Sequence, residues 1–252
     1  MKKIVIANWK MNPVSLTEAK KLFTETKRKA GALKKTQVVV CSPFVFLSSL
    51  IVKKNKKFFL GSQDSFWIPF GAYTGEVSSE MLKSLGVSHV IVGHSERRGM
   101  GETDEMVSKK IASLTKLQIV PVLCIGERER DTHGEYLAIL SKQIKASLSG
   151  VQKKDVKNIV IAYEPIWAIG KTAEEAMNPH KLHEMVLYIR KVLTEIYGRD
   201  IAQSVQIIYG GSVESKNAQA LMKDGNVSGF LVGHASLSAK GFGEIITAVE
   251  KS

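Results

Sequence analysis

The chain has 252 residues, of which 44% are hydrophobic and 24% are charged, and its formal net charge is +12. This composition is typical of a globular protein with a large apolar core, and it argues against a disordered or low-complexity chain. No apolar run approaches the roughly 18 residues of a membrane span, and the run behind residues 1–3 is too short for a signal peptide. We therefore expect a cytoplasmic protein with no membrane partner.

The excess of positive charge, with a pI near 9.6, raises the question of a nucleic-acid partner. The lysines are scattered over amphipathic segments, however, and no known nucleic-acid-binding motif is present. The densest run, residues 53–57, falls between expected elements, where a solvated surface is the simplest interpretation. We expect no nucleic-acid partner, although a positive field would help to attract a small anion.

Short β-branched apolar runs recur along the whole chain, and each ends in a polar or glycine-containing loop. Continuous rather than alternating apolar runs are typical of parallel strands that are covered on both faces. Helical periodicity follows in segments such as 17–30, 103–116, 135–148 and 180–197. The eight runs comprise residues 4–7, 38–41, 58–61, 90–93, 119–124, 159–162, 205–209 and 229–232.

Strict alternation of eight strands with helical segments favours a closed (β/α)8 barrel over an open doubly wound sheet. We therefore predict an α/β fold with a single barrel domain over residues 1–252. Pro121 argues against the fifth strand and is tolerable only near its start, because proline cannot donate to a strand ladder. Cys41 and Cys124 both end expected strands, which indicates buried, reduced thiols.

In such barrels the reacting groups lie at the carboxyl ends of the strands. Glu164 directly follows the sixth run, and Pro165 then ends the strand. A carboxylate there lies partly in low dielectric, which favours proton uptake and suits a general base. The next residues are mostly apolar and end at Gly170, so they would form a lid that excludes water from a ligand. Taken alone, Glu164 would more simply be a solvent-facing side chain, but the other strand ends argue against that.

Polar side chains also follow the first and fourth runs. Asn8 and Lys10 are two residues apart, so extended backbone would point both into the mouth of the barrel. Lysine there supplies positive charge for an anionic substrate or an oxyanion, although surface lysines are common in this chain. His94, as a neutral imidazole, would donate a proton or a hydrogen bond to a carbonyl oxygen. A lone histidine at a strand end is more often structural. The expected pairing of His94 with Glu164 favours a catalytic role instead.

The loops after the seventh and eighth strands are where barrels commonly bind phosphate, through backbone N–H groups and a short helix. Residues 210–212, Gly-Gly-Ser, are small enough to let backbone approach phosphate oxygens. Gly-Gly-Ser alone is a weak indication of phosphate binding, but its position after the seventh strand strengthens the indication. We expect no metal, because His180 and His183 have helical spacing but lack cysteine or carboxylate partners.

Seven short motifs occur in order along the chain: ANWKMN at 7–12, TGEVS at 74–78, GHSERR at 93–98, GETD at 101–104, CIGE at 124–127, AYEPIWAIG at 162–170 and YGGSV at 209–213. Together they resemble the triosephosphate isomerase family over essentially the whole chain. The resemblance implies a TIM barrel that interconverts dihydroxyacetone phosphate and D-glyceraldehyde 3-phosphate through an enediol or enediolate. It also implies a role in glycolysis and gluconeogenesis, with no cofactor and no metal.

The resemblance further implies catalytic roles for individual residues. Glu164 would be the base that moves a proton between two carbons, and His94 the neutral electrophile, as is known for this family. Lys10 would be the electrostatic partner, and Asn8 would orient the substrate by hydrogen bonds. Two further residues would hold these side chains by contacts from behind: Glu96 and Cys124.

Phosphate binding is the point at which the chain departs from the family. The resemblance assigns the phosphate to Gly170, Ser212, Gly233 and His234. The family usually has a second glycine where His234 stands, and a positive φ at a histidine would cost about 1 kcal/mol or more, at the expense of substrate affinity. The far hinge of the lid reads Lys-Thr-Ala at 171–173 rather than the commoner Thr-Gly-Lys, which leaves the register beyond Gly170 open.

Residues 66–71 are strongly apolar although they lie in an expected loop. Exposed apolar surface of this kind usually meets another subunit. The family inserts this loop into a neighbouring copy, so we expect a homodimer that forms through the loop from about Phe70 to Ser78.

Two other functions remain open from the sequence. One is an aldolase on the same barrel, with Lys10 as the amine that forms a Schiff base. The other is a non-catalytic sugar-phosphate binder whose catalytic site has been impaired by His234.

Overall fold

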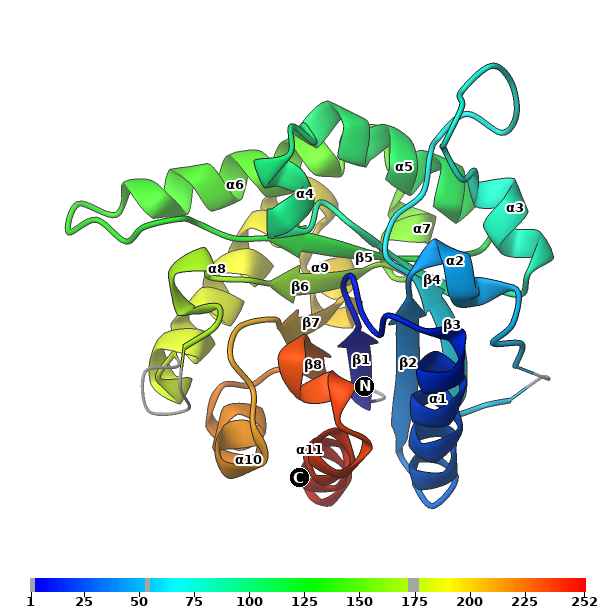
Figure 1. Ribbon diagram of the computed structural model, residues 1–252. Helices are drawn as coiled ribbons and strands as arrows, with labels where there is room; N and C mark the ends of the chain where they lie inside the picture. Colours follow the sequence, from blue (N-terminus) through cyan, green and yellow to red (C-terminus); the bar gives the residue numbers. More distant parts are fainter. Residues whose placement is uncertain (1–2, 53–54, 172–176) are drawn as a thin grey trace.

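The computed structural model describes residues 3–52, 55–171 and 177–252. Its strands are all parallel and close into one barrel in chain order, with β8 returning to pair with β1 (Figure 1). This confirms the predicted (β/α)8 architecture. The strands are β1 (Lys3–Asn8), β2 (Thr36–Ser42), β3 (Phe58–Ser62), β4 (His89–Val92), β5 (Val120–Ile125), β6 (Val160–Tyr163), β7 (Gln206–Tyr209) and β8 (Gly229–Val232).

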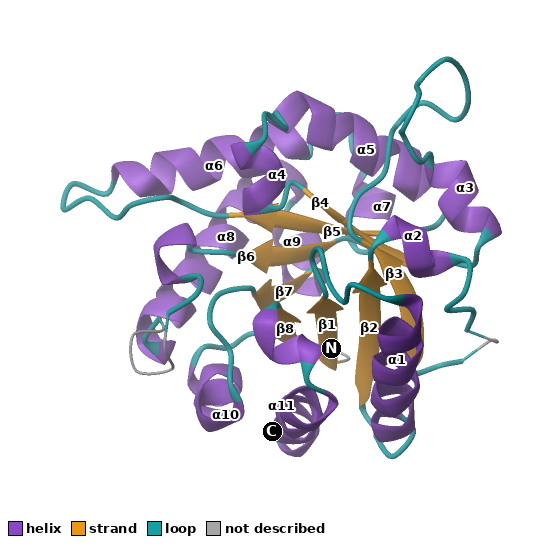
Figure 2. Ribbon diagram, in the orientation of Figure 1, coloured by secondary structure: helices purple, strands orange, loops and turns teal. Residues whose placement is uncertain are grey.

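Helices surround the barrel on the outside (Figure 2). The α-helices are α1 (Leu16–Ala30), α2 (Phe44–Leu47), α3 (Ser79–Ser84), α4 (Ser95–Gly99), α5 (Asp104–Lys116), α6 (Glu135–Ser147), α7 (Lys153–Val156), α8 (Pro179–Tyr197), α9 (Arg199–Ser204), α10 (Ser215–Asp224) and α11 (Ala239–Lys251). Two 3-10 turns, η1 (Ile166–Ala168) and η2 (His234–Leu237), follow β6 and β8. Within the described ranges, none of the helices is long and apolar enough to cross a membrane.

Side-chain caps explain where two of the predicted helices begin. Ser15 accepts a hydrogen bond from the backbone N–H of Glu18 at the start of α1, and Thr103 accepts one from Met106 at the start of α5. Such caps satisfy N–H groups that have no partner within the helix. The helices predicted over 17–30 and 103–116 therefore begin within one residue of the expected position.

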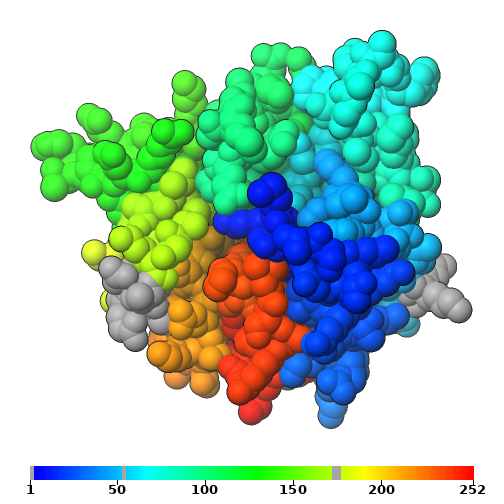
Figure 3. All heavy atoms as spheres, in the orientation of Figure 1, coloured from blue at the N-terminus to red at the C-terminus, as the bar shows by residue number. Residues whose placement is uncertain are grey.

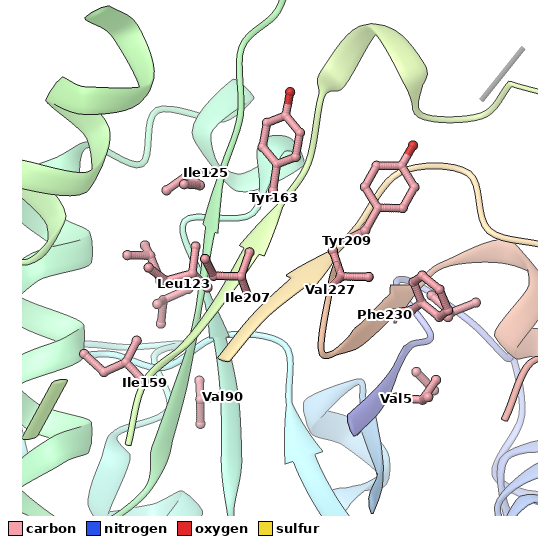
Figure 4. Packing of buried hydrophobic residues seen from close by; sticks show 14 of the residues in the cluster. Val5, Val90, Leu123, Ile125, Ile159, Tyr163, Ile207, Tyr209, Val227 and Phe230 are labelled. Carbon is pink, nitrogen blue, oxygen red and sulfur yellow. The ribbon is translucent and has the colours of Figure 1, made fainter. Parts of the chain in front are cut away.

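The two buried faces of each strand account for the continuous apolar runs. Successive side chains of a strand point to opposite faces, and in β1 Ile4 and Ile6 join one buried cluster while Val5 and Ala7 join the other. The first cluster fills the inside of the barrel. The second packs between the strands and the helices, and Figure 4 shows some of its side chains. Because both faces are dry, no polar alternation is left in the sequence.

Pro121 lies near the start of β5, as its missing donor requires. It is the second residue of the strand and pairs with Val90 of β4. The remainder of β5 continues to Ile125 and pairs with β6 from Val122 onward. The position of the proline at the beginning of the strand is therefore as predicted.

His89 is a buried histidine and the first residue of β4, so it lies at the amino end of the strand and not at the carboxyl end. Its ring packs edge-on against Phe59 with 5.6 Å between the ring centroids, and Nδ1 lies 2.8 Å from the hydroxyl of Ser88. Burial lowers the pKa of His89 from 6.5 to about 4. The imidazole is therefore neutral in the folded protein at neutral pH.

This burial predicts a loss of stability in mild acid. As the pH falls, the unfolded chain binds a proton at His89 before the folded protein does, so stability is lost between about pH 6.5 and pH 4. From about pH 7 to pH 5 the loss due to this residue is about 2 kcal/mol in the free energy of unfolding. Urea unfolding of His89→Gln should show a correspondingly smaller loss. His133→Gln, at an exposed site, should behave like the parent; equal losses in all three proteins would contradict the prediction.

Candidate active site

A pocket of about 270 Å³ opens at the carboxyl ends of the strands. It is formed by residues that follow β1, β4, β6, β7 and β8, which are far apart in the sequence. Figure 3 shows the segment after β1 next to the segment after β8 on this face of the molecule. All the residues predicted to act on or bind a substrate line this pocket: Asn8, Lys10, His94, Glu164, Gly170, Ser212, Gly233 and His234.

Glu164 is buried, with only 2% of its surface exposed, so it is not a solvent-facing residue at a strand end. Its backbone N–H continues the ladder by donating to the carbonyl of Ile125, at 2.8 Å. Its carboxylate accepts a hydrogen bond from the backbone N–H of Ser95, at 3.3 Å, and Oε1 lies 3.3 Å from Nε2 of His94. A buried carboxylate needs such partners, because burial penalises its charge.

Two glycines make room for this carboxylate residue. A Cβ atom on Gly210 would lie 2.7 Å from Cγ of Glu164, and one on Gly126 would lie 1.8 Å from the Glu164 carbonyl oxygen. Both distances are too short for a carbon atom. Gly210 was expected to let backbone approach a phosphate, and the structure shows that it also leaves space for the Glu164 side chain.

A hydrogen bond at the start of α4 determines which ring nitrogen of a neutral His94 carries the proton. Nδ1 of His94 accepts a hydrogen bond from the backbone N–H of Glu96, at 3.2 Å. A nitrogen that accepts a hydrogen bond carries no proton, so the proton of the neutral ring lies on Nε2. Nε2 is the nitrogen that faces Glu164, and it is therefore the donor available to a ligand in the pocket.

The backbone at Lys10 differs from the sequence-based expectation. Asn8 is the last residue of the extended strand β1, but Lys10 has a φ of +52°, in the left-handed region, so the extended backbone expected to continue to Lys10 was wrong, although both residues do line the pocket. Such a conformation costs a side-chain-bearing residue roughly 1–2 kcal/mol. The Lys10 N–H donates to the side-chain oxygen of Asn8, at 3.1 Å, and the amide of Gln63 donates to the Lys10 carbonyl, at 2.9 Å.

Gln63 was missed by the sequence analysis. Its side-chain amide bridges two carbonyl oxygens, those of Lys10 and Cys41, from a loop that follows β3. A single glutamine in a loop has no spacing pattern that would reveal this contact. Only the closure of the barrel brings the loop after β3 beside the segment after β1.

Glu96 and Cys124, which were expected to hold the central side chains, lie next to Lys10 and Glu164. Glu96 forms an ion pair with Lys10, with 2.6 Å between Nζ and Oε1. Cys124 is fully buried, and burial together with the neighbouring charge of Glu164 raises the pKa of its thiol well above the usual range. The thiol is therefore protonated and neutral behind the carboxylate.

A buried glutamate, Glu127, holds the segment after β6 that was expected to form a lid. Glu127 Oε1 accepts hydrogen bonds from the hydroxyl of Tyr163, at 2.8 Å, the indole of Trp167, at 3.0 Å, and Nε of Arg130, at 3.2 Å. Figure 4 shows the hydroxyl of Tyr163 at the same end of the barrel as that of Tyr209. Glu127 lies in the CIGE motif, so the motif was seen but its contact to the lid was not.

Ser212 also contacts this segment. Its hydroxyl donates to the carbonyl of Ala168, at 3.0 Å, and its own carbonyl accepts a hydrogen bond from Asn217. Gly170 has a φ of +74°, a conformation that favours glycine at this turn. The predicted hinge departure at 171–173 lies largely outside the described residues, since only Lys171 of the three is described.

His234 does not carry the backbone strain that was considered for it. In the described part of the chain, the non-glycine residues with positive φ are Lys10, Gln118 and Asn226. His234 instead begins the 3-10 turn η2 and has an exposed side chain. Gly233, just before it, faces the Lys10 side chain, since a Cβ atom there would lie 3.5 Å from Lys10 Cε.

The described residues include no group of three histidine, cysteine, aspartate or glutamate side chains that could hold a metal ion. The pocket therefore combines a buried carboxylate, a neutral imidazole, an ammonium group and two glycine-bearing loops. This arrangement can move a proton and stabilise negative charge on an oxygen atom.

The chain is similar to known proteins of one family. The family model described as Triosephosphate isomerase matches residues 3–249. The triosephosphate isomerase of Alkaliphilus oremlandii (strain OhILAs) is 44% identical to this chain, and the match covers 97% of this chain and 98% of the relative. The enzymes of Caldanaerobacter subterraneus subsp. tengcongensis and Dictyoglomus turgidum are 42% and 39% identical and cover 96% and 97% of this chain, and 98% of each relative.

The space beside Glu164 can be tested with Gly210→Ala. The added methyl group would lie 2.7 Å from Glu164 Cγ, so the carboxylate must move away from His94. A crystal structure should show the Nε2–Oε1 separation increased beyond 3.3 Å, and any turnover in the pocket should fall by about 100-fold. Gly99→Ala is the matched control, because a Cβ atom there meets nothing within 4 Å. An unchanged Glu164 position in Gly210→Ala would contradict the argument.

Proposed function

The chain belongs to the triosephosphate isomerase family and is an intramolecular isomerase, and we propose that it interconverts dihydroxyacetone phosphate and D-glyceraldehyde 3-phosphate with Glu164 as the base. The observation that carries this proposal is the position of Glu164 Oε1, 3.3 Å from His94 Nε2 in one pocket with Lys10. Glu164 removes a proton from one carbon of the substrate and returns it to the neighbouring carbon. The intermediate between the two steps is an enediol or enediolate.

His94 and Lys10 act on the substrate oxygens in this proposal. The Nε2–H of the neutral imidazole donates to the carbonyl oxygen, the role known for the corresponding histidine of this family. The ammonium group of Lys10 stabilises the negative charge that develops on oxygen. Asn8, at the end of β1, holds the Lys10 backbone by its side-chain oxygen and orients the substrate with its amide group.

The phosphate group binds in the same pocket, at Gly170, Ser212, Gly233 and His234. Backbone N–H groups at these small or turn-forming residues are suited to phosphate oxygens. The hydrogen bonds of Ser212 and Glu127 to the lid segment support a lid that closes on the phosphate and excludes water. Glu96 and Cys124 keep Lys10 and Glu164 in position.

The pairing of Lys10 argues against the aldolase alternative. The amine of a Schiff-base lysine must be unprotonated to attack a carbonyl carbon. Lys10 Nζ, the atom that would have to attack, is instead held in an ion pair with the carboxylate of Glu96, at 2.6 Å. His234 does not have a positive φ, so the backbone cost that would have impaired the site is absent. This argues against a non-catalytic binder.

We propose glycolysis and gluconeogenesis as the metabolic setting, since the two triose phosphates are intermediates of both routes. A cytoplasmic location is supported by Cys41 and Cys124, which are free, buried thiols. No cofactor is needed, because the proton is carried by the carboxylate.

The role of Glu164 is tested by Glu164→Gln in coupled assays started from each triose phosphate. Glutamine has nearly the same shape but cannot accept the proton, so kcat should fall by about 10³-fold or more while a phosphate-bearing inhibitor still binds. Glu214→Gln is the control, since Glu214 also lines the pocket but is exposed at the start of α10, and most turnover should remain. Near-parental turnover of Glu164→Gln, or borohydride trapping of substrate on Lys10, would show that the mechanism is wrong.

We also propose that two copies pair through the loop between β3 and α3. This loop projects from the barrel (Figure 1), and Phe70 and Tyr73 on it are 83% and 48% exposed. A second pocket of about 300 Å³, lined in part by Met11, Phe44 and Met100, lies beside Lys10 on the barrel. A projecting apolar loop and an apolar-lined hollow on the same chain are complementary in a symmetric dimer.

Light scattering tests this dimer directly. The parent protein should have twice the mass of one 27.7 kDa chain, and Phe70→Asp should shift it toward the monomer, because a charge would be buried in the interface. Turnover should fall with the mass, since the second pocket adjoins Lys10. Ile139→Asp, at an exposed apolar site on α6, should remain dimeric. A monomer mass for the parent at all concentrations would refute the proposal.

A further inference from the structure

Another hollow, distinct from the two pockets described above and with a volume of about 460 Å³, lies at the amino ends of strands β1 to β3. It is at the other end of the barrel from Glu164. Five of the seven residues that line it are lysines. We call it the lysine hollow, and its lysines are Lys3, Lys34, Lys35, Lys56 and Lys57.

The fold assembles the lysine hollow from three separate segments. Lys3 is the first residue of β1, residues 34–37 enter β2, and residues 56–57 precede β3. Strand pairing holds these segments together, because Lys3 is in register with Thr36, and the N–H of Val38 donates to the Lys57 carbonyl, at 2.7 Å. The sequence suggested only a solvated run at 53–57, since nothing in it showed that Lys3 and Lys34 lie alongside.

The positive charge of the hollow is not neutralised by acidic side chains. Over residues 3–52, 55–171 and 177–252, no ion pair joins any of its five lysines to a carboxylate. The ammonium groups of Lys3 and Lys57 donate instead to neutral carbonyls, those of Val249 and Leu33. Like charges gathered in this way repel one another, and an anion would relieve that repulsion.

One carboxylate does contact the rim of the hollow, but it is bonded to backbone. Glu250 accepts hydrogen bonds from the N–H groups of Lys34, at 2.7 Å, Lys35, at 3.0 Å, and Thr36, at 2.9 Å. Burial opposes its ionisation, yet these hydrogen bonds hold its pKa down to about 2. Glu250 therefore shapes the segment that leads into β2, and its single charge leaves the lysines in excess.

The shape and lining of the hollow indicate the kind of anion it fits. Its other two lining residues are Thr36 and Gln37, so no aromatic ring is present on which a base would stack. It also has no apolar side chain to insert into a lipid layer. Five lysines that line one concave space supply several positive charges close together, which suits the closely spaced charges of linked phosphates. We propose that the lysine hollow binds a multivalent phosphate anion of the inorganic polyphosphate class.

Calorimetric titration of the full chain with inorganic triphosphate at low ionic strength tests this proposal. Saturating triose phosphate is kept present so that the catalytic pocket is occupied. The combined variant Lys34→Gln, Lys35→Gln, Lys56→Gln should bind triphosphate about tenfold or more weakly, and added salt should weaken binding to the parent. These three lysines are exposed and make no side-chain contact on which the barrel depends, so the isomerase rate should be unchanged.

The control carries the same change in net charge at exposed sites on α6, α8 and α10: Lys142→Gln, Lys191→Gln, Lys223→Gln. It should bind triphosphate as the parent does. An equal loss in both combined variants would show a general charge effect and would overturn the proposal. It would also be overturned if the parent bound a single-stranded oligonucleotide or anionic phospholipid vesicles but not triphosphate, since the ligand would then belong to another class.

Discussion

The burial of the Glu164 carboxylate beside the imidazole of His94 is the constraint on which the rest of the pocket depends. A carboxylate with 2% exposure requires donors, and it has the Ser95 N–H and the Nε2 side of His94. His94 can offer a proton from Nε2 only because its Nδ1 accepts the N–H of Glu96 at the start of α4. One short helix therefore sets both the tautomer of the imidazole and the position of the carboxylate.

The same constraint explains the small residues around the pocket. Gly126 and Gly210 have no side chain because the backbone and side chain of Glu164 occupy that space. The left-handed backbone at Lys10 is a related compromise, because a conformation that costs free energy is held by hydrogen bonds from Gln63 and to Asn8. The stability of the barrel, with its two dry layers, allows these local costs at one end.

The two ends of the barrel differ in whether their charged side chains form ion pairs. At the carboxyl ends the charged groups are paired, as in Lys10 with Glu96 and in the buried contacts of Lys110 with Asp64 and Glu102. At the amino ends of β1 to β3, no ion pair joins the ammonium groups of the lysines to a carboxylate among the described residues, and Glu250 is bonded there to backbone N–H groups. A high net charge read from composition thus becomes informative only once its distribution over the fold is known.

Much of this protein could be predicted from its sequence because the signals are local. Doubly covered strands leave continuous apolar runs, helix starts leave Ser15 and Thr103, and the motifs around Glu164 and His94 stand directly after strands. These strand ends, together with the resemblance to the triosephosphate isomerase family, identified the candidate pocket residues without coordinates. What only the tertiary structure decided depends on contacts between segments distant in sequence: Gln63 holding Lys10, Glu127 holding Trp167, the unstrained backbone at His234, and the gathering of Lys3, Lys34 and Lys56. A side chain's neighbours across a closed barrel are set by strand register and backbone angles, and neither leaves a pattern at a fixed spacing in the chain.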